Sequence, residues 1–176
     1  MTTARPSDGL VDAAALRRTC GLFATGVTVI TSAHGGMTAG TTVNSFTSVS
    51  LDPPLVLFCL HRESRLHEII TGSRAFAVNL LHAEQGTLAH AFARRSTAVL
   101  DEVDHRRTPS GTPVFAESLA YLDCRLAAEY GGGDHSILVG EVVDLAIHDA
   151  GSDPLVFFGG SLHSLDNPLR RRAGLR

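Results

Sequence analysis

The chain has 176 residues, a formal net charge of −3 at pH 7 and a hydrophobic content of 44%. These values fit one globular domain with a sizeable core, and they exclude a disordered chain and a protein with a global basic footprint for nucleic acid. All 15 basic residues are arginine, which excludes chemistry that needs a Schiff-base lysine or a phosphate-loop lysine.

The N-terminal part predicts one helix followed by a hairpin. Asp12 can cap a helix that runs to about Ala24, and Gly26 ends it. The run "VTVITSA" predicts a strand, "HGG" a tight turn and "MTAGTTV" the returning arm of the hairpin. After the break at Asp52, Pro53 and Pro54, the pattern predicts a strand over Leu55–Leu60, a short helix over Arg65–Thr71 and the strand "AFAVNLL".

The second half predicts one more helix and three more strands. The helix covers Ala83–Arg94 with Leu88, Ala89 and Phe92 facing inward, and the polar stretch 95–113 is typical of a long surface excursion. The strands are expected over Leu119–Tyr130, Ser136–Ile147 and Leu155–Gly159, and the alternation in "YLDCRLAAEY" favours antiparallel pairing. Short antiparallel strands with few helices predict a mostly β domain closed into a barrel. Its expected bounds are residues 11–166, between tails at 1–10 and 167–176.

Several kinds of site and location are excluded by what the sequence lacks. No apolar run reaches the roughly 20 residues of a membrane span, and the first residues lack a signal-peptide core, so a cytoplasmic location is expected. Cys20, Cys59 and Cys124 are too far apart for a thiolate zinc site. None of the nine histidines lies three or four residues from another, so no metal site is expected.

The first candidate segment is a polar run, Thr41–Ser50, between two apolar strands. Asn44 and Ser45 begin an irregular loop, after which Phe46, Ser48 and Ser50 share one face of a short strand. Hydroxyls and backbone groups beside apolar walls suit a planar heteroaromatic ligand with polar edges. An edge strand that faces water explains the same pattern equally well.

The second candidate segment is "CLHRESRL", in which Ser64 can cap the helix that follows. Helix N-terminal N–H groups together with Arg62 and Arg65 bind a phosphate without a lysine. An ordinary cap with solvated arginines is the alternative, and this segment alone favours it.

The third candidate segment is "GGGDHSILVGEV". Gly131–Gly133 allow a free turn or a close approach of a ligand, Asp134 can orient His135, and His135 can donate to an amide or a phosphate. A flexible hairpin turn with an exposed histidine is the alternative, and the turn alone favours it.

Taken together, these segments resemble the flavin reductase family, the short NAD(P)H:flavin oxidoreductases that serve two-component flavin-dependent monooxygenases. The motifs are "FATGVTVIT", "NSFTSVSLDPPLVLFCL", "FAVNLL", "GGGDHSILVGEV" and "PLVFFGGSLHSL", and they run from about Leu16 to Leu165. The resemblance implies a split β-barrel, an antiparallel Greek-key-type barrel related to the FMN-binding split barrel, and a homodimer with flavin near its interface.

The resemblance also implies an activity. The expected enzyme transfers a hydride from NADH to FAD or FMN and supplies reduced flavin to a partner flavin-dependent monooxygenase by diffusion. NADPH is less favoured because no arginine pair for a 2′-phosphate is evident. The cofactors carry this chemistry, so no catalytic side chain is expected. The alternatives are a tightly flavin-bound oxidase of the pyridoxamine-phosphate-oxidase-like type, and a non-catalytic flavin- or haem-binding barrel.

Carried onto this sequence, the resemblance assigns residues to three parts of the flavin and to the nicotinamide nucleotide. His135 is expected to contact NADH, and Leu162 stands where many members carry an aromatic residue. The residues expected to hold the isoalloxazine are Thr38, Gly40, Thr41, Thr42, Asn44, Ser45, Phe46 and Ser48. Those expected to line the ribityl chain and phosphate are Cys59, Leu60, His61, Ser64 and Arg65, and those expected to reach the flavin tail are Ala91 and Phe92.

Overall fold

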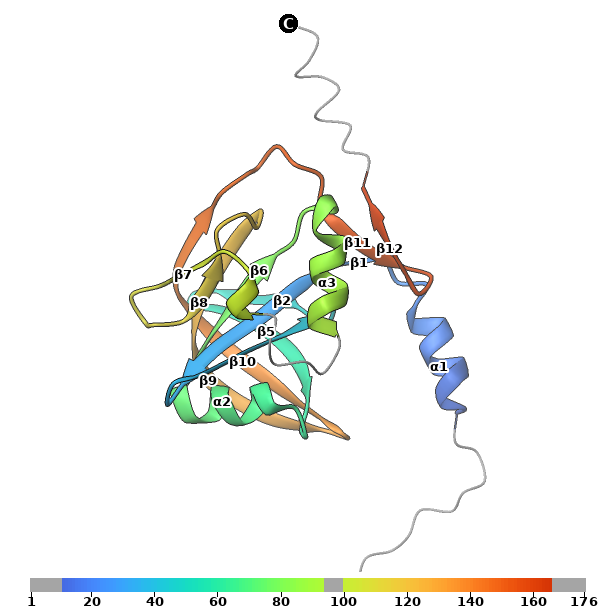
Figure 1. The fold of residues 1–176 in the computed structure, drawn as a ribbon. Helices are drawn as coiled ribbons and strands as arrows, with labels where there is room; N and C mark the ends of the chain where they lie inside the picture. Colours follow the sequence, from blue (N-terminus) through green and yellow to red (C-terminus); the bar gives the residue numbers. More distant parts are fainter. Residues whose placement is uncertain (1–10, 94–99, 166–176) are drawn as a thin grey trace, which may run out of the picture.

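The computed structural model describes residues 11–93 and 100–165, and within them the protein is mostly β with three α-helices (Figure 1). The α-helices are α1 (Ala13–Cys20), α2 (Arg65–Ser73) and α3 (Gly86–Ala93), and the short 3-10 helices are η1 (Ala83–Gln85) and η2 (Leu100–Glu102). The strands are β1 (Thr25–Gly26), β2 (Thr28–His34), β3 (Met37–Val43), β4 (Thr47–Leu51), β5 (Pro54–His61), β6 (Ala75–Leu80), β7 (His105–Arg107), β8 (Pro113–Phe115), β9 (Ala120–Gly132), β10 (His135–Ile147), β11 (Leu155–Phe158) and β12 (Ser161–Ser164).

The main element is a seven-stranded sheet in the order β3-β2-β6-β9-β10-β5-β4, in which every pairing is antiparallel. A three-stranded sheet, β1-β11-β12, and the β7-β8 hairpin complete the described strands. The closed barrel expected from the sequence is not observed, because β3 and β4 end the sheet and do not pair with each other. After β3 the chain turns at Asn44–Phe46, and β4 then pairs with β5 instead.

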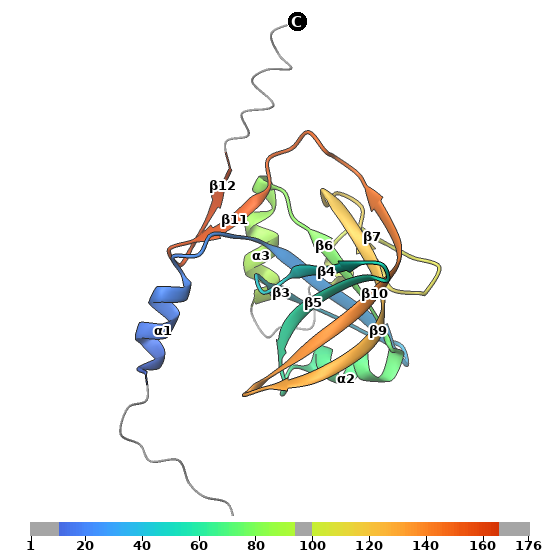
Figure 2. The same cartoon turned by 180° about the vertical axis from the view of Figure 1, so that it is seen from behind.

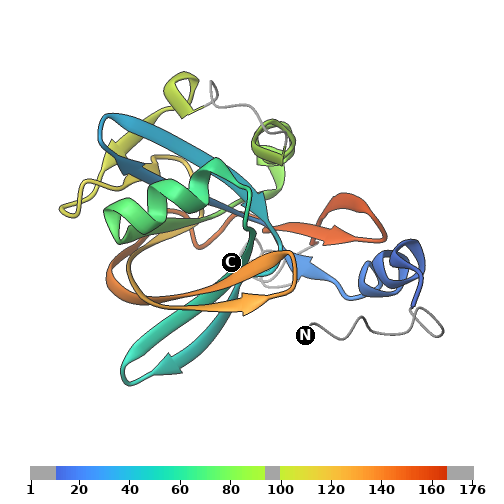
Figure 3. The same cartoon turned by 90° about the horizontal axis from the view of Figure 1, so that it is seen from below.

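Two core clusters explain why five consecutive residues of β2, Thr28–Ser32, are all buried. Ile30 packs into one cluster with Phe58, Phe76 and the buried face of α2, whereas Val29 packs into a second cluster with α3. Since side chains alternate along a strand, β2 is covered on both faces. Seen from below, α2 lies between the β2–β3 hairpin and the β9–β10 hairpin (Figure 3).

Two predicted segments differ from the structure. The first helix ends at Cys20 with Gly21 as its cap, before the expected Ala24. The described part of the predicted surface excursion is only partly at the surface, because Arg106, Arg107 and Pro109 are exposed whereas Leu100, Thr108 and Thr112 are buried. Buried polar groups tie this segment to the sheet. The Asn79 side chain accepts the Phe115 N–H at 2.8 Å, and the Thr31 hydroxyl donates to the Pro113 carbonyl. Residues 94–99 lie outside the described residues.

Helix α1 packs differently from α2 and α3, because none of its residues is buried. It extends away from the curved sheet, on the same side as the β11–β12 hairpin (Figure 2). The Gly159 N–H donates to the Gly21 carbonyl at 2.8 Å, which joins the hairpin turn to the end of the helix. Leu16 on the helix and Phe23 just after it are both exposed.

No helix among the described residues is long and apolar enough to cross a membrane. The two expected tails, 1–10 and 167–176, lie outside the described residues.

Candidate functional site

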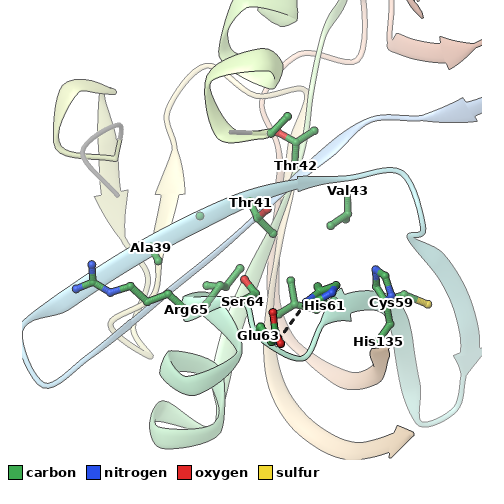
Figure 4. Close-up of a pocket in the computed structure, with 14 residues that line it drawn as sticks. Ala39, Thr41, Thr42, Val43, Cys59, His61, Glu63, Ser64, Arg65 and His135 are labelled. Atoms are coloured by element: carbon green, nitrogen blue, oxygen red, sulfur yellow. Dashed lines mark hydrogen bonds between the residues drawn. The ribbon is translucent and has the colours of Figure 1, made fainter. Parts of the chain in front are cut away.

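A cavity of about 400 Å³ opens between β3, the end of β5, the start of α2 and the first residue of β10 (Figure 4). Its lining comes from all three segments that the sequence analysis selects. Nine of the expected flavin and nucleotide residues lie on its wall: Gly40, Thr41, Thr42, Cys59, Leu60, His61, Ser64, Arg65 and His135. Folding thus brings together side chains that are far apart in the sequence.

The β3 wall of the cavity is supported from behind by α3. A Cβ added at Gly40 would lie 2.7 Å from Cε1 of Phe92, so the ring of Phe92 occupies the space that a side chain would need. The Thr42 hydroxyl donates to the Ala89 carbonyl at 2.7 Å and holds the strand to the helix. Phe92 is 2% exposed and supports this wall from the core, and its expected contact with a flavin tail stays a prediction.

The β5 wall is held by the polar loop after β3. The Ser45 hydroxyl accepts the N–H of Cys59 at 2.9 Å and donates to the Cys59 carbonyl at 3.2 Å. Both hydrogen-bonding functions of this hydroxyl are thereby used within the protein. Ser45 consequently positions the strand that carries Cys59 and His61.

The start of α2 forms the most polar part of the wall. Ser64 is the N-cap residue of α2, and its side chain makes no capping hydrogen bond, although the backbone N–H of His67 donates to the Ser64 carbonyl at 2.9 Å. Figure 4 shows Arg65 at one end of the cavity, Glu63 and Ser64 in the middle, and His61, His135 and Cys59 at the other end. The Arg65 end can neutralise an anion.

The imidazole end is formed by two cross-strand neighbours. His61 of β5 is in register with His135 of β10, and their ring centroids lie 5.3 Å apart at an interplanar angle of 76°. His135 Nδ1 lies 2.7 Å from Oδ1 of Asp134, as expected from the sequence. The hydrogen bond with His135, followed by the nearby ring's charge, lowers the pKa of the Asp134 carboxyl from its ordinary value.

Two other titratable groups among the described residues have shifted pKa values. Hydrogen bonds from Ser136 and then His67 lower the pKa of the Glu129 carboxyl below its ordinary value. Burial raises the pKa of the Cys124 thiol, and the neighbouring Asp123 carboxylate adds to the rise. Cys124 is therefore a buried core thiol, whereas Cys59 is half-buried on the cavity wall.

A smaller cavity of about 210 Å³ adjoins the first, since both are lined by Thr42, Val43 and Ala93. Asn44 and Leu162 lie on its wall. The expected residues that line neither cavity are Thr38, Ser45, Phe46, Ser48, Ala91 and Phe92.

Sequence reasoning missed several wall residues, of which Glu63 is the one with a charged side chain. Glu63 lies between His61 and Ser64 in the sequence, and this position next to two expected site residues could have identified it. Within residues 11–93 and 100–165, no group of three or more histidine, cysteine, aspartate or glutamate side chains could hold a metal ion.

Comparisons with known proteins point to one family. The family described as "Flavin reductase like domain" matches residues 20–166. The chain is 43% identical over 145 residues to the FMN reductase (NADH) SmoA of Agrobacterium fabrum, covering 82% of each chain. It is 39% identical over 151 residues to the reductase component of the 4-nitrophenol 4-monooxygenase/4-nitrocatechol 2-monooxygenase of Rhodococcus opacus, covering 85% of this chain and 80% of that one.

A solved structure gives the same result. The NADH:FAD oxidoreductase SgcE6 of Streptomyces globisporus, in complex with NAD and FAD fragments, superposes with a TM-score of 0.84 at 37% identity. The match covers 96% of this chain and 99% of that one. The resemblance drawn from the sequence motifs is therefore confirmed. The names of these relatives also agree with the predicted activity and with NADH and a flavin as cofactors.

Proposed function

Because the chain belongs to the flavin reductase-like family, we propose that it reduces FAD or FMN with NADH and supplies the reduced flavin to a flavin-dependent monooxygenase. One observation of this structure carries the proposal. The polar loop region, the start of α2 and the β9–β10 hairpin converge on a single cavity of about 400 Å³. That volume lies in the range of roughly 300–1,000 Å³ that is usual for small-molecule and cofactor sites.

The residues present fit a flavin. Gly40, Thr41 and Thr42 carry no side chain larger than threonine, so this wall exposes strand backbone to a planar ring system. Arg65 and the uncapped start of α2 suit the phosphate, and no lysine is needed there. We place the isoalloxazine along β3 and β5, and the phosphate at the Arg65 end.

Bound flavin supplies the hydride acceptor, and the side chains of this protein bind and orient the two cofactors. Ser45 fixes β5 relative to the loop after β3, and Phe92 keeps β3 in place from behind. Asp134 holds the ring of His135 at the rim, where NADH enters in this proposal. Since the protein mainly aligns two rings, the absence of an acid/base pair among the expected site residues is consistent with this role.

The finer structural features expected from the family are also part of the proposal. We propose that the curved sheet is the split β-barrel of the family, with its Greek-key-type arrangement, in a single domain of residues 11–166. We propose a homodimer because large apolar side chains are exposed on and just after α1 and at the far end of β10. These residues include Leu16, Phe23, Val143, Leu145 and Ile147. The cytoplasmic location stays a prediction.

The experiment that tests the activity follows NADH by its nicotinamide absorbance in the presence of FAD, FMN or no flavin. The proposal expects NADH loss that depends on added flavin. The amount of NADH oxidised is expected to exceed the molar amount of protein many times. Flavin that copurifies tightly and is not exchanged would favour an oxidase of the pyridoxamine-phosphate-oxidase-like type. Flavin binding without NADH loss would favour a non-catalytic binding barrel.

A further inference from the structure

A glutamate and an arginine line the main cavity, and they carry opposite charges. Arg65 lies at one end of the cavity, whereas Glu63 lies in the middle, on the side of His61 (Figure 4). The backbone N–H of Glu63 donates to His61 Nδ1 at 3.2 Å, which fixes this residue at the end of β5. The salt bridges of the described residues do not join Glu63 to Arg65. The cavity therefore has a positive end and a negative charge closer to its other end.

The carboxylate of Glu63 is unpaired within residues 11–93 and 100–165, because no hydrogen bond or ion pair there includes it. Two other acidic side chains of this region differ in this respect. Glu129 Oε1 lies 2.7 Å from His67 Nε2, and Asp134 Oδ1 lies 2.7 Å from His135 Nδ1. Neither Glu129 nor Asp134 lines the cavity. Glu63 is thus the carboxylate that faces a ligand without a partner of its own.

An unpaired carboxylate is unfavourable on the wall of a cavity that binds an anion, because like charges repel each other. The proposed ligands, FMN and FAD, are anionic through their phosphates. With the phosphate at the Arg65 end, the ring system lies on the other side of Glu63. The wall therefore suits a ligand that is negative at one end and neutral at the other, and oxidised flavin is such a ligand.

Reduction changes the charge of the ring. The hydride of NADH carries two electrons and one hydrogen nucleus to flavin N5, and NADH becomes NAD⁺. No proton is taken up in this step, so the ring gains one negative charge, which spreads over N1 and the C2 carbonyl. We propose that the carboxylate of Glu63 weakens the binding of reduced flavin relative to oxidised flavin, and thereby favours release of the product. This inference rests on the proposed function.

The ratio of two dissociation constants isolates this effect. Glu63 also repels the phosphate, but the phosphate has the same charge in both oxidation states, so that repulsion cancels when the constant of reduced FMN is divided by that of oxidised FMN. Because Glu63 is exposed, water and salt screen its charge, and a change of a few-fold is expected. High salt should reduce the change further.

The test measures the dissociation constants of oxidised FMN and of chemically reduced FMN by anaerobic calorimetry, at low and at high salt. No NADH is present, so the result does not depend on turnover. The proteins are the unsubstituted chain, Glu63→Gln, Glu63→Asp and Glu68→Gln. Glu63→Asp keeps the charge. Glu68→Gln is the matched control, because it removes an equal charge from an exposed residue in the first turn of α2 that does not line the cavity.

The unsubstituted protein is expected to bind reduced FMN more weakly than oxidised FMN. Glu63→Gln should lower the ratio of the two constants about two- to fivefold at low salt, and by less at high salt. Riboflavin has the ring but no phosphate, so its ratio should fall by a similar factor. Glu63→Asp and Glu68→Gln should both keep the ratio of the unsubstituted protein.

An unchanged ratio in Glu63→Gln would overturn the inference. If both constants of that variant changed equally, Glu63 would instead repel the phosphate or bind the ribityl hydroxyls. An equal fall of the ratio in Glu68→Gln would also overturn it, because the effect would then come from the net charge of the protein. Failure of the proposed function has a different signature, in which the unsubstituted protein does not bind flavin or does not oxidise NADH when flavin is added.

Discussion

The hydroxyl of Ser45 both accepts the N–H of Cys59 and donates to the carbonyl of the same residue. This pair of bonds joins the irregular loop after β3 to the strand that forms the opposite wall of the cavity. It explains why a polar run lies between two apolar strands. One hydroxyl of the run satisfies backbone groups of β5 that would otherwise lack a partner within the protein.

Ser45→Ala is expected to lower the free energy of unfolding by about 1–2 kcal/mol, because two half-buried backbone groups of Cys59 lose their partner. It is also expected to weaken flavin binding, since the β5 wall is no longer fixed. Thr47→Ala is the control, because Thr47 is exposed and its hydroxyl bonds to the adjacent Ser48 carbonyl. Urea unfolding and flavin titration measure both effects. Equal stability of the two variants would show that Ser45 does not hold the wall.

Arg65→Ala is expected to weaken the binding of FMN and FAD by about 1–3 kcal/mol, as for loss of a charge-assisted hydrogen bond to phosphate. Riboflavin lacks the phosphate, so its affinity should change much less. Arg18→Ala removes an equal charge from α1, away from the cavity, and controls for the change in net charge. Fluorescence titration of the three flavins provides the constants. An equal loss of affinity for riboflavin and FMN would show that Arg65 does not bind the phosphate.

Gly40→Ala tests the support of the β3 wall. The added methyl group would meet Phe92 at 2.7 Å, so the ring or the strand has to shift. We expect a loss of about 1–3 kcal/mol in stability, the usual cost of overpacking, together with weaker flavin binding. Gly26→Ala is the matched control, because a Cβ at this strand glycine meets nothing within 4 Å.

The double variant Gly40→Ala with Phe92→Leu separates a clash from other effects. The smaller side chain leaves room for the methyl group, so the two substitutions should be less damaging together than their separate effects predict. Additive losses would show that Phe92 is not what excludes a side chain at position 40.

The three cysteines provide a probe of the cavity that needs no turnover. Cys20 is exposed and should react first with a thiol reagent, whereas burial and a raised pKa keep Cys124 unreactive until the protein unfolds. Cys59 lines the cavity, so saturating FMN should slow its labelling at least several-fold. Mass spectrometry of the labelled peptides assigns each rate. Equal labelling of Cys59 with and without FMN would place the flavin elsewhere.

The homodimer has its own test. The exposed apolar residues on and just after α1, which include Leu16 and Phe23, are expected to be covered by a second copy. Light scattering at micromolar concentration should give the mass of a dimer, and Phe23→Glu should shift it toward the monomer. Arg18→Glu reverses a charge on the same helix and is the control. A monomer mass for the unsubstituted chain would contradict the expected assembly.

Local features could be predicted from the sequence because neighbours in the chain decide them. The Asp12 cap of α1 and the Asp134–His135 contact each involve residues within a few positions of each other. Long-range relationships could not be predicted from the residues alone. The opposition of His61 and His135 depends on the β5–β10 register, and the burial of Phe92 under Gly40 depends on how α3 packs on β3. The prediction of a closed barrel was wrong for the same reason, because the strand order depends on pairing between strands that are far apart in the sequence.

The central claim is that flavin is a substrate that leaves after reduction. The most direct measurement mixes a small amount of the protein anaerobically with excess NADH and excess free FMN or FAD, and follows the bleaching of flavin absorbance. The account predicts reduction of all the free flavin at a rate proportional to protein concentration, with no NADH loss when flavin is omitted. Reduction that stops at one flavin per chain, or no reduction at all, would contradict it.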